Sequence, residues 1–199
     1  MNGPTDETER DAGSFAVWAA DMVAAMRGER AANVPCDGCT ACCTSSQFVH
    51  IGPDETATLA RIPPELLVPA PQMPRGHVVL GYDERGHCPL LVDGACSIYD
   101  DRPRTCRTYD CRIFPATGLD PAADGKPEIA ARARTWRFRS STGDDHARRA
   151  AVVAAVEFVR AREPATNVTQ LAARAVELHE GFLEAVLGDD APARDRGDE

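Results

Sequence analysis

The sequence contains few aromatic residues, almost no lysine and no long hydrophobic run. Aromatic side chains make up 6% of the 199 residues, so we expect a modest apolar core. No run approaches the roughly 18 to 20 apolar residues that cross a bilayer, and we therefore expect no transmembrane helix. The first residues are acidic and polar, so the apolar stretch 15–26 lacks the positive flank of a secretory signal. These absences predict a cytoplasmic protein.

The charge balance is acidic. The formal net charge is −9, the sequence pI is about 5.1, and the 22 basic residues are almost all arginines scattered along the chain. Because phosphate groups require a broad basic face, neither a nucleic acid nor a membrane is an expected partner. A protein partner is compatible with this composition, although no segment of the sequence identifies it.

Helical periodicity is found near both ends of the chain. A first amphipathic helix is predicted after the capping residue Ser14, with apolar side chains at Phe15, Trp18, Met22 and Met26. A helical hairpin is predicted over about residues 144–187 and is divided at Pro164. The apolar stripes of the hairpin are Val152, Val156 and Val159 in one arm, and Leu171, Ala175, Leu178, Phe182 and Val186 in the other.

The middle of the chain, from residue 36 to residue 114, is irregular and rich in Pro, Gly and Asp. It predicts loops, a short helix over about 53–61 and short strands in apolar runs such as 48–51 and 78–82. Residues 115–127 are predicted as a loop, and residues 133–138 as an edge strand. The expected fold class is mainly α, with an irregular, cysteine-rich metal-binding region (α plus short strands) and a C-terminal helical hairpin.

The predicted domain organisation is simple. We expect a single domain over residues 14–187, containing the cysteine-cluster region 36–114 and the hairpin. A disordered N-terminus, residues 1–13, precedes it, and a disordered acidic tail, residues 188–199, follows it.

Eight cysteines lie between residues 36 and 111. Because cytosolic thiols are kept reduced, metal ligation is favoured over the alternatives of four disulfides or inert thiols. A segment with so little apolar surface also needs another source of stability, which bound metal supplies. The candidate ligands fall into two groups: Cys36, Cys39, Cys42 and Cys43, then Cys88, Cys96, Cys106 and Cys111.

The spacing of the cysteines does not identify the metal. The C-x-x-C-x-x-C run from Cys36 is the spacing of ferredoxin loops, whose next ligand is a remote cysteine followed by proline, as Cys88 is here. Eight thiols also fill two tetrahedral zinc sites. Since the adjacent residues Cys42 and Cys43 cannot easily point at one ion, they are candidates to serve two different sites. The expected cofactor is therefore zinc or an iron-sulfur cluster.

Other polar residues support no specific reaction. Of the five histidines only His87 adjoins a cysteine, and we expect it at the surface, while His146 and His179 are expected to be solvated or capping. Dinucleotide, phosphate-loop, serine-hydrolase and radical-SAM motifs are not found, so no catalytic residue is assigned. The arginines among the second cysteine group are expected either to offset thiolate charge or to pair with Asp100, Asp101 or Asp110; they are Arg102, Arg104, Arg107 and Arg112.

Three ordered motifs carry a resemblance to a known family. They are Cys36-Asp-Gly-Cys39-Thr-Ala-Cys42-Cys43, Cys88-Pro-Leu-Leu, and Cys96-Ser-Ile-Tyr-Asp-Asp-Arg-Pro-Arg-Thr-Cys106-Arg. Together, over residues 36–114, they resemble the YkgJ family of CxxCxxCC cysteine-cluster proteins. The resemblance implies a zinc- or iron-chelating domain in which all eight cysteines are ligands. One departure is Asp110, where family members often have proline before the last cysteine.

Two functional hypotheses follow from these observations. The first is a non-enzymatic metal-binding protein whose metal organises the fold. The second is an iron-sulfur redox protein or oxidoreductase component, which requires a redox-active cluster.

Overall fold

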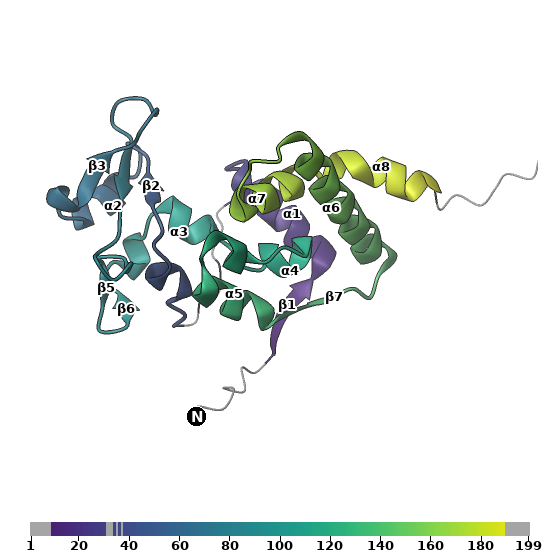
Figure 1. The fold of residues 1–199 in the computed structure, drawn as a ribbon, viewed down its shortest axis with the longest axis horizontal. Coiled ribbons are helices and arrows are strands. Elements are labelled where there is room, and N and C mark those ends of the chain that lie inside the picture. Colours follow the sequence, from purple (N-terminus) through teal and green to yellow (C-terminus); the bar gives the residue numbers. More distant parts are fainter. Residues whose placement is uncertain (1–8, 31–33, 35, 37, 190–199) are drawn as a thin grey trace, which may run out of the picture. The chain divides into compact units, whose positions relative to one another are not determined.

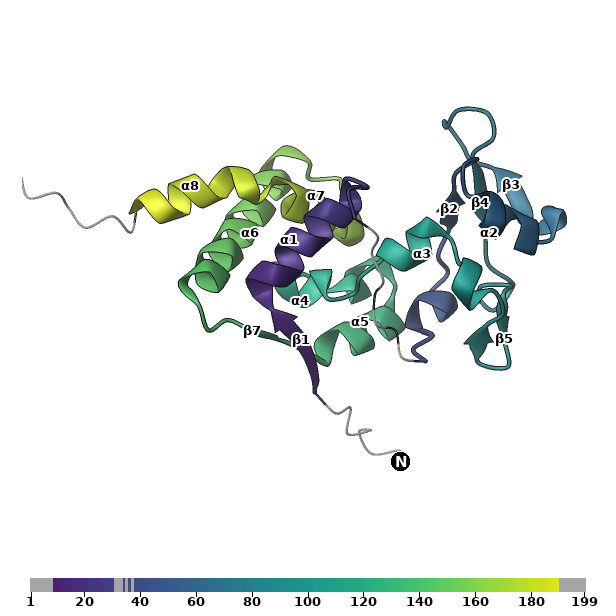
Figure 2. The same ribbon diagram turned by 180° about the vertical axis from the view of Figure 1, so that it is seen from behind.

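The computed structural model describes residues 9–30, 34, 36 and 38–189, which form eight α-helices and several short strands (Figures 1 and 2). The chain divides into two compact units, each assembled from segments that are distant in the sequence. Unit 1 comprises residues 1–29, 112–120 and 134–199, and unit 2 comprises residues 30–111 and 121–133. The single domain expected over residues 14–187 stays a prediction.

Unit 1 is mostly helical. In it α6 packs against α7 and α8, and α1 packs against α6 and α7. Figures 1 and 2 show these helices side by side from opposite directions. The elements of unit 1 are β1 (Arg10–Ser14), α1 (Phe15–Met26), α4 (Ile113–Thr117), β7 (Trp136–Arg139), α6 (Gly143–Arg162), α7 (Val168–Leu178) and α8 (Glu180–Asp189).

Helix α1 begins where the sequence predicts it. The Ser14 hydroxyl accepts a hydrogen bond from Val17 N at 3.4 Å, which satisfies one of the free amides of the first turn. Phe15 and Trp18 are buried and, together with Phe138 of β7, form a cluster with ring centroids 5.0–5.8 Å apart. The predicted stripe is wrong at its far end, because Val23 is buried while Met26 is exposed.

The predicted hairpin is present as α6 and α7, separated at Pro164, and its second arm is interrupted at His179. His179 caps α7, as expected, but it is fully buried rather than solvated. Its Nδ1 donates to the Val176 carbonyl at 2.6 Å, the oxygen that an unbroken helix would offer to the amide of residue 180. This competition explains why α7 ends and α8 begins as a separate helix.

Strand β1 departs from the expectation of a disordered N-terminus. Its residues pair in parallel with β7, with Arg10 opposite Trp136 and Ser14 opposite Arg139. The edge strand expected at residues 133–138 is therefore present but begins three residues later, because Ala133 and Arg134 complete a helix. The disordered tail expected over residues 188–199 is wrong at its first two positions, because Gly188 and Asp189 belong to α8. The other expectations of disorder fall on residues 1–8 and 190–199, which lie outside the described residues.

The loop predicted over residues 115–127 is wrong for most of its length, because parts of three helices lie there, joined by residues 118–120 and 125–126. Pro115 occupies the first turn of α4, where no amide donor is needed, and Gly118 ends that helix with a left-handed φ of 69°. Pro121 and Pro127 likewise open a 3₁₀ helix, η4 (Pro121–Asp124), and α5 (Pro127–Arg134). The prolines that suggested a loop are thus helix starts.

Unit 2 combines short helices with two small antiparallel sheets. The apolar runs at 48–51 and 78–82 form strands, as predicted, and pair with each other in a sheet of order β2-β4-β3. The second sheet is the hairpin β5-β6. The elements are β2 (Val49–Ile51), β3 (Leu67–Pro69), β4 (Val78–Leu80), β5 (Leu91–Val92), β6 (Ala95–Cys96), α2 (Thr56–Arg61), α3 (Arg104–Thr108) and α5, with the 3₁₀ helices η1 (Ala41–Thr44), η2 (Pro64–Leu66), η3 (Tyr99–Asp101) and η4.

Among the described residues of unit 2, one apolar cluster, which we call the unit 2 core, contains six buried side chains: Val49, Ile51, Ile62, Leu80, Leu90 and Ile98. Leu59, Leu66, Leu67 and Val78 pack against it, and Ile129, Ala130 and Ala133 of α5 are also buried. Within the described part of the chain, no helix is both long and apolar enough to cross a membrane.

Candidate metal centre

The eight cysteines all lie in unit 2, and all are free thiols that are neither fully buried nor fully exposed. The structure therefore gathers in one unit every cysteine that the sequence proposes as a ligand. Metal sites need thiols that are not paired in disulfides, and the eight cysteines meet this condition.

The first cysteines lie on two consecutive turns. Cys39 N donates to the Cys36 carbonyl at 2.8 Å, and Gly38 between them has a left-handed φ of 74° that favours glycine. Cys42 and Cys43 follow in η1, where Cys43 N donates to the Thr40 carbonyl at 2.8 Å. Because a 3₁₀ helix has three residues per turn, neighbouring side chains differ in direction by about 120°. Cys42 and Cys43 therefore point in different directions.

Cys88 is held beside Cys43 by the backbone. Cys88 N donates to the Cys43 carbonyl at 2.7 Å. The preceding turn is closed by Asp83, whose backbone N–H donates to the His87 carbonyl at 2.7 Å and whose carboxylate accepts from His87 N at 2.9 Å. His87 thus shapes the turn through its backbone.

Cys96 and Cys106 come from β6 and α3 and share a packing surface with Cys88. All three thiols pack against the unit 2 core. Cys96 also lies opposite Leu91 in the β5-β6 hairpin, and Leu91 N donates to the Cys88 carbonyl at 3.0 Å. Three cysteines that are up to 18 positions apart in the sequence therefore contact the same apolar core.

A buried carboxylate fixes the helix that carries Cys106. Glu55, which is 8% exposed, accepts hydrogen bonds from Arg104 N at 2.5 Å and from Gly52 N at 2.9 Å. Thr105 Oγ1 donates to the His50 carbonyl at 2.7 Å. These bonds join the start of α3 to β2 and to the segment before α2, so that Cys106 has a defined position.

Burial and neighbouring thiols raise the pKa of Cys43 and of Cys106. Burial raises the pKa of Cys43 to about 12, and the neighbouring thiols of Cys88 and Cys96 act in the same direction. Burial likewise raises the pKa of Cys106 to about 12, with further contributions from Cys43, Cys88 and Cys96. Negative charge on these sulfurs is therefore unfavourable unless a cation lies among them.

Cys42 and Cys36 also have raised pKa values, and the thiols that act on them overlap with those that act on Cys43, because Cys36 and Cys39 raise the pKa of Cys43 and Cys43 raises that of Cys42. Burial raises the pKa of Cys42 well above its usual value, and Cys111 is the thiol that contributes most to this shift, followed by Cys36. The pKa of Cys36 is raised by burial, and Cys39 and the buried Asp110 add to the shift. Asp110, the departure from the family pattern, thus lies close enough to influence this group.

Of the four arginines proposed from the sequence, Arg102 has the closest link to the thiols. Its side chain is 7% exposed, its guanidinium carbon lies 4.0 Å from the centroid of the Tyr99 ring, and its Nη1 donates to the Tyr99 carbonyl at 3.2 Å. Its charge opposes the rise in the pKa of both Cys36 and Cys106. Arg102 therefore lies near both groups of thiols.

The other arginines have different surroundings. Arg104 is exposed and pairs with Asp54 at 2.5 Å, while Arg107 is half-buried. Arg112 belongs to unit 1, where its guanidinium lies 5.8 Å from the centroid of the Trp136 ring. Of the three proposed carboxylate partners, Asp101 does form an ion pair, but with Arg61 at 3.3 Å.

Two histidines form a pair that the sequence did not reveal. His50 Nε2 and His77 Nδ1 lie 2.9 Å apart, and their rings stack with centroids separated by 5.1 Å. They are 27 positions apart, and only the pairing of β2 with β4 brings their segments together. His146, by contrast, is exposed, in agreement with the expectation that it is solvated.

The thiol donors suit a borderline or soft metal ion, although they do not converge on one position where an ion would sit. Within the described residues, no three His, Cys, Asp or Glu side chains are close enough to hold one ion as they stand. The chemistry of the donors nevertheless suits zinc or iron-sulfur ligation, since eight reduced thiols lie in one unit with mutual repulsion and a nearby buried cation.

Comparison with known proteins agrees with this chemistry. Residues 35–128 match the family model CxxCxxCC, which is described as a "putative zinc- or iron-chelating domain". No curated protein and no solved structure is significantly similar to the chain. The family match spans a little under half of the chain and includes all eight cysteines, so the cysteine-bearing segment is similar to a metal-chelating domain.

Proposed function

We propose that the chain is a metal-binding protein whose eight cysteines hold zinc, and that this metal organises unit 2. The observation that carries the proposal is the gathering of eight free, half-buried thiols in the unit with the small apolar core. Each structural zinc site contributes on the order of 10 kcal/mol to folding, which is substantial beside what six buried side chains supply.

A structural role follows from the donor count. When bound, zinc supplies a tetrahedral cross-link between chain segments, and four thiolates leave it no open position for water. Such a site would join η1, the β5-β6 hairpin and α3, which have little apolar contact area of their own. We also propose that the chain belongs to the YkgJ family. The match over residues 35–128 supports the more general description, a zinc- or iron-chelating domain.

The second candidate is an iron-sulfur protein with a redox role. It is favoured by the C-x-x-C-x-x-C spacing from Cys36 to Cys42 and by the buried charge of Arg102 near these thiols. The position of Cys88 counts against a ferredoxin-like set, because its backbone is bonded to Cys43 and its thiol packs on the unit 2 core.

Elemental analysis of the full chain, purified without oxygen, tests the proposal. We expect about two zinc ions per chain and no visible colour. Iron with acid-labile sulfide and a brown colour would instead establish the second candidate, and Cys39→Ser should then remove or shift a reversible reduction wave. A chain that binds neither metal while all eight thiols remain reduced would reject both.

A further inference from the structure

We propose that the junction between α7 and α8 is a pH-sensitive hinge: when His179 becomes charged in mild acid, its ring leaves the interior of unit 1 and α8 separates from α6. His179 is the one residue between α7 and α8, since α7 ends at Leu178 and α8 begins at Glu180. Its side chain is fully buried, although it lies at a helix end. All residues of the hinge belong to unit 1, so its operation does not depend on metal binding in unit 2.

The hydrogen bond of His179 determines which nitrogen takes up the proton in acid. Nδ1 lies 2.6 Å from the Val176 carbonyl oxygen. Because a carbonyl oxygen only accepts, Nδ1 carries the hydrogen of the neutral ring and Nε2 is the basic nitrogen. Nε2 is buried and has no hydrogen-bond partner among the residues that the structure describes. Protonation therefore creates a buried, positively charged N–H donor with no acceptor in the described part of unit 1.

The charges around the ring also oppose protonation. Burial is the main cause of a lowered pKa at His179, and the charges of Arg148 in α6 and Arg27 after α1 add to it, against the effects of the Val176 carbonyl and of Glu180 in α8. Helix α4, which also packs against α7, has no titratable side chain. The Glu180 carboxylate is already paired with Arg27 at 2.9 Å. The buried position therefore suits the neutral ring.

The direction of the pH effect follows from the lowered pKa of His179. The unfolded chain binds a proton at this residue at a higher pH than the folded chain does. The buried arrangement thus has its full stability above the unfolded-state pKa, about 6.5, and loses stability as the pH falls below that value.

Departure of the ring changes the backbone at the junction. The Val176 carbonyl becomes available to the amide of Glu180, its partner in an unbroken helix, so that α7 and α8 join. In the neutral form α8 packs against α6, where the centroids of the Phe182 and Phe158 rings are 5.4 Å apart. Joining the helices turns α8 away from α6 and separates these rings. The ion pair of Arg27 with Glu180 is exposed at both ends and opposes this movement only weakly.

Nuclear magnetic resonance of the unaltered full chain tests the hinge. The imidazole signal of His179 and the nuclear Overhauser effect between the rings of Phe158 and Phe182 are followed from about pH 7.5 to about pH 4.5. We expect His179 to become charged below the usual histidine value, about 6.5, and the effect between the rings to disappear over the same interval. A ring contact that persists after His179 is charged would overturn the proposal, and so would a His179 that stays neutral at about pH 4.5.

Three substitutions separate the hinge from general effects of acid. His179→Asn keeps a side-chain N–H for the Val176 carbonyl but cannot become charged, so the ring contact should persist at about pH 4.5. Arg148→Met removes a positive charge that acts on His179 and should move the loss of contact to higher pH, a test that does not require His179→Asn to fold. His146→Asn, at an exposed position of α6, is the control and should leave the transition unchanged. A transition at the same pH in all three variants would point to metal loss or another effect of acid and would overturn the proposal.

Discussion

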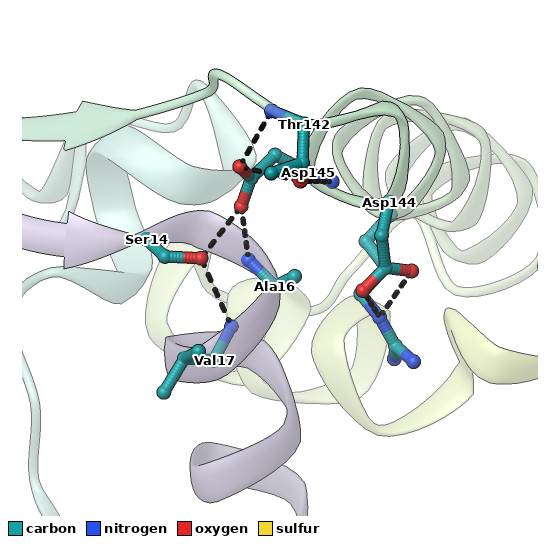
Figure 3. A network of polar contacts seen from close by, with 7 residues as sticks. Ser14, Ala16, Val17, Thr142, Asp144 and Asp145 are labelled. Carbon is teal, nitrogen blue, oxygen red and sulfur yellow. Dashed lines mark hydrogen bonds and ion pairs between the residues drawn. The ribbon is translucent and has the colours of Figure 1, made fainter.

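Asp145 and Ser14 lie 131 positions apart and are joined by a hydrogen bond of 2.7 Å, in which the Ser14 hydroxyl donates to Asp145 Oδ1. The same oxygen accepts from Ala16 N at 2.9 Å, in the first turn of α1 (Figure 3). The other oxygen, Oδ2, accepts from the Thr142 backbone at 3.1 Å and from the Thr142 hydroxyl at 2.8 Å, at the start of α6. One buried carboxylate thus caps two helices at once.

Asp145→Asn should therefore lower the midpoint of thermal unfolding clearly, because an amide nitrogen replaces one acceptor oxygen and faces N–H and O–H donors. The adjacent Asp144 provides a matched control. It is exposed and forms only an ion pair with Arg148 at 3.1 Å, so Asp144→Asn should shift the midpoint by about 1 °C. Circular dichroism melting of both variants is the measurement, and equal shifts would contradict the capping role.

Acid should also weaken unit 1 through Asp145. Hydrogen bonds from Ala16 N, the Ser14 hydroxyl and Thr142 hold the pKa of this carboxyl well below its usual range. Because the pKa of Asp145 is lower in the folded state than in the unfolded state, its charged carboxylate stabilises the fold. This stabilisation is complete above the unfolded-state pKa, about 4, and is lost as the pH falls toward the folded-state pKa.

The matching measurement is thermal unfolding of the unaltered chain and Asp145→Asn at a series of pH values from about 6 down to about 2.5. The difference between their midpoints should shrink as the pH falls. A difference that is independent of pH would show that the Asp145 charge plays no part.

Gly86→Ala should weaken metal binding by the thiol of Cys88. Gly86 has a φ of 79°, and an added Cβ would collide with Ser46 Oγ, while the Gly86 carbonyl accepts from Ser46 N at 2.9 Å. The collision and the strain of alanine at a positive φ both displace the turn that precedes Cys88.

Gly94→Ala is the control for this change. Gly94 has a φ of 76° and lies two residues before Cys96, but an added Cβ there meets nothing within 4 Å. Chelator competition should give a weaker apparent zinc affinity for Gly86→Ala than for Gly94→Ala. Equal affinities would mean that the contact with Ser46 does not position Cys88.

Removing the charge of Arg102 should weaken the proposed zinc binding. Tetrathiolate zinc is anionic, and Arg102 is the buried cation whose charge acts on Cys36 and on Cys106. For Arg102→Met we expect a loss of roughly three- to tenfold in apparent zinc affinity, and a smaller loss for Arg102→Lys. Arg104→Met, which removes an exposed arginine paired with Asp54, should leave the affinity unchanged.

Metal removal should loosen unit 2 and leave unit 1 intact. Hydrogen exchange measured by mass spectrometry, with and without chelator, should show faster exchange in residues 38–111 and unchanged exchange in α6 and α7. The reason is that α6 and α7 bury a continuous stripe of their own, whereas the unit 2 core has six side chains. Equal protection of unit 2 in both conditions would argue against a structural metal.

The sequence predicts most of the helices of unit 1. Periodic apolar residues, the cap at Ser14 and the break at Pro164 are local signals, and they predicted α1, α6 and α7. Local signals mislead where one residue type fits two structures. The prolines in residues 115–127 predict a loop but open helices, and the buried His179 ends a helix that periodicity alone would continue.

For the candidate metal centre, the sequence determined the chemistry. Eight cysteines at these spacings define the donor atoms and favour metal over disulfides, because redox compartment and ligand type depend on composition and spacing. Tertiary structure decided which thiols are neighbours. The bond between Cys88 and Cys43, the packing of Cys106 against the unit 2 core and the burial of Arg102 depend on contacts between distant segments, which spacing along the chain does not encode.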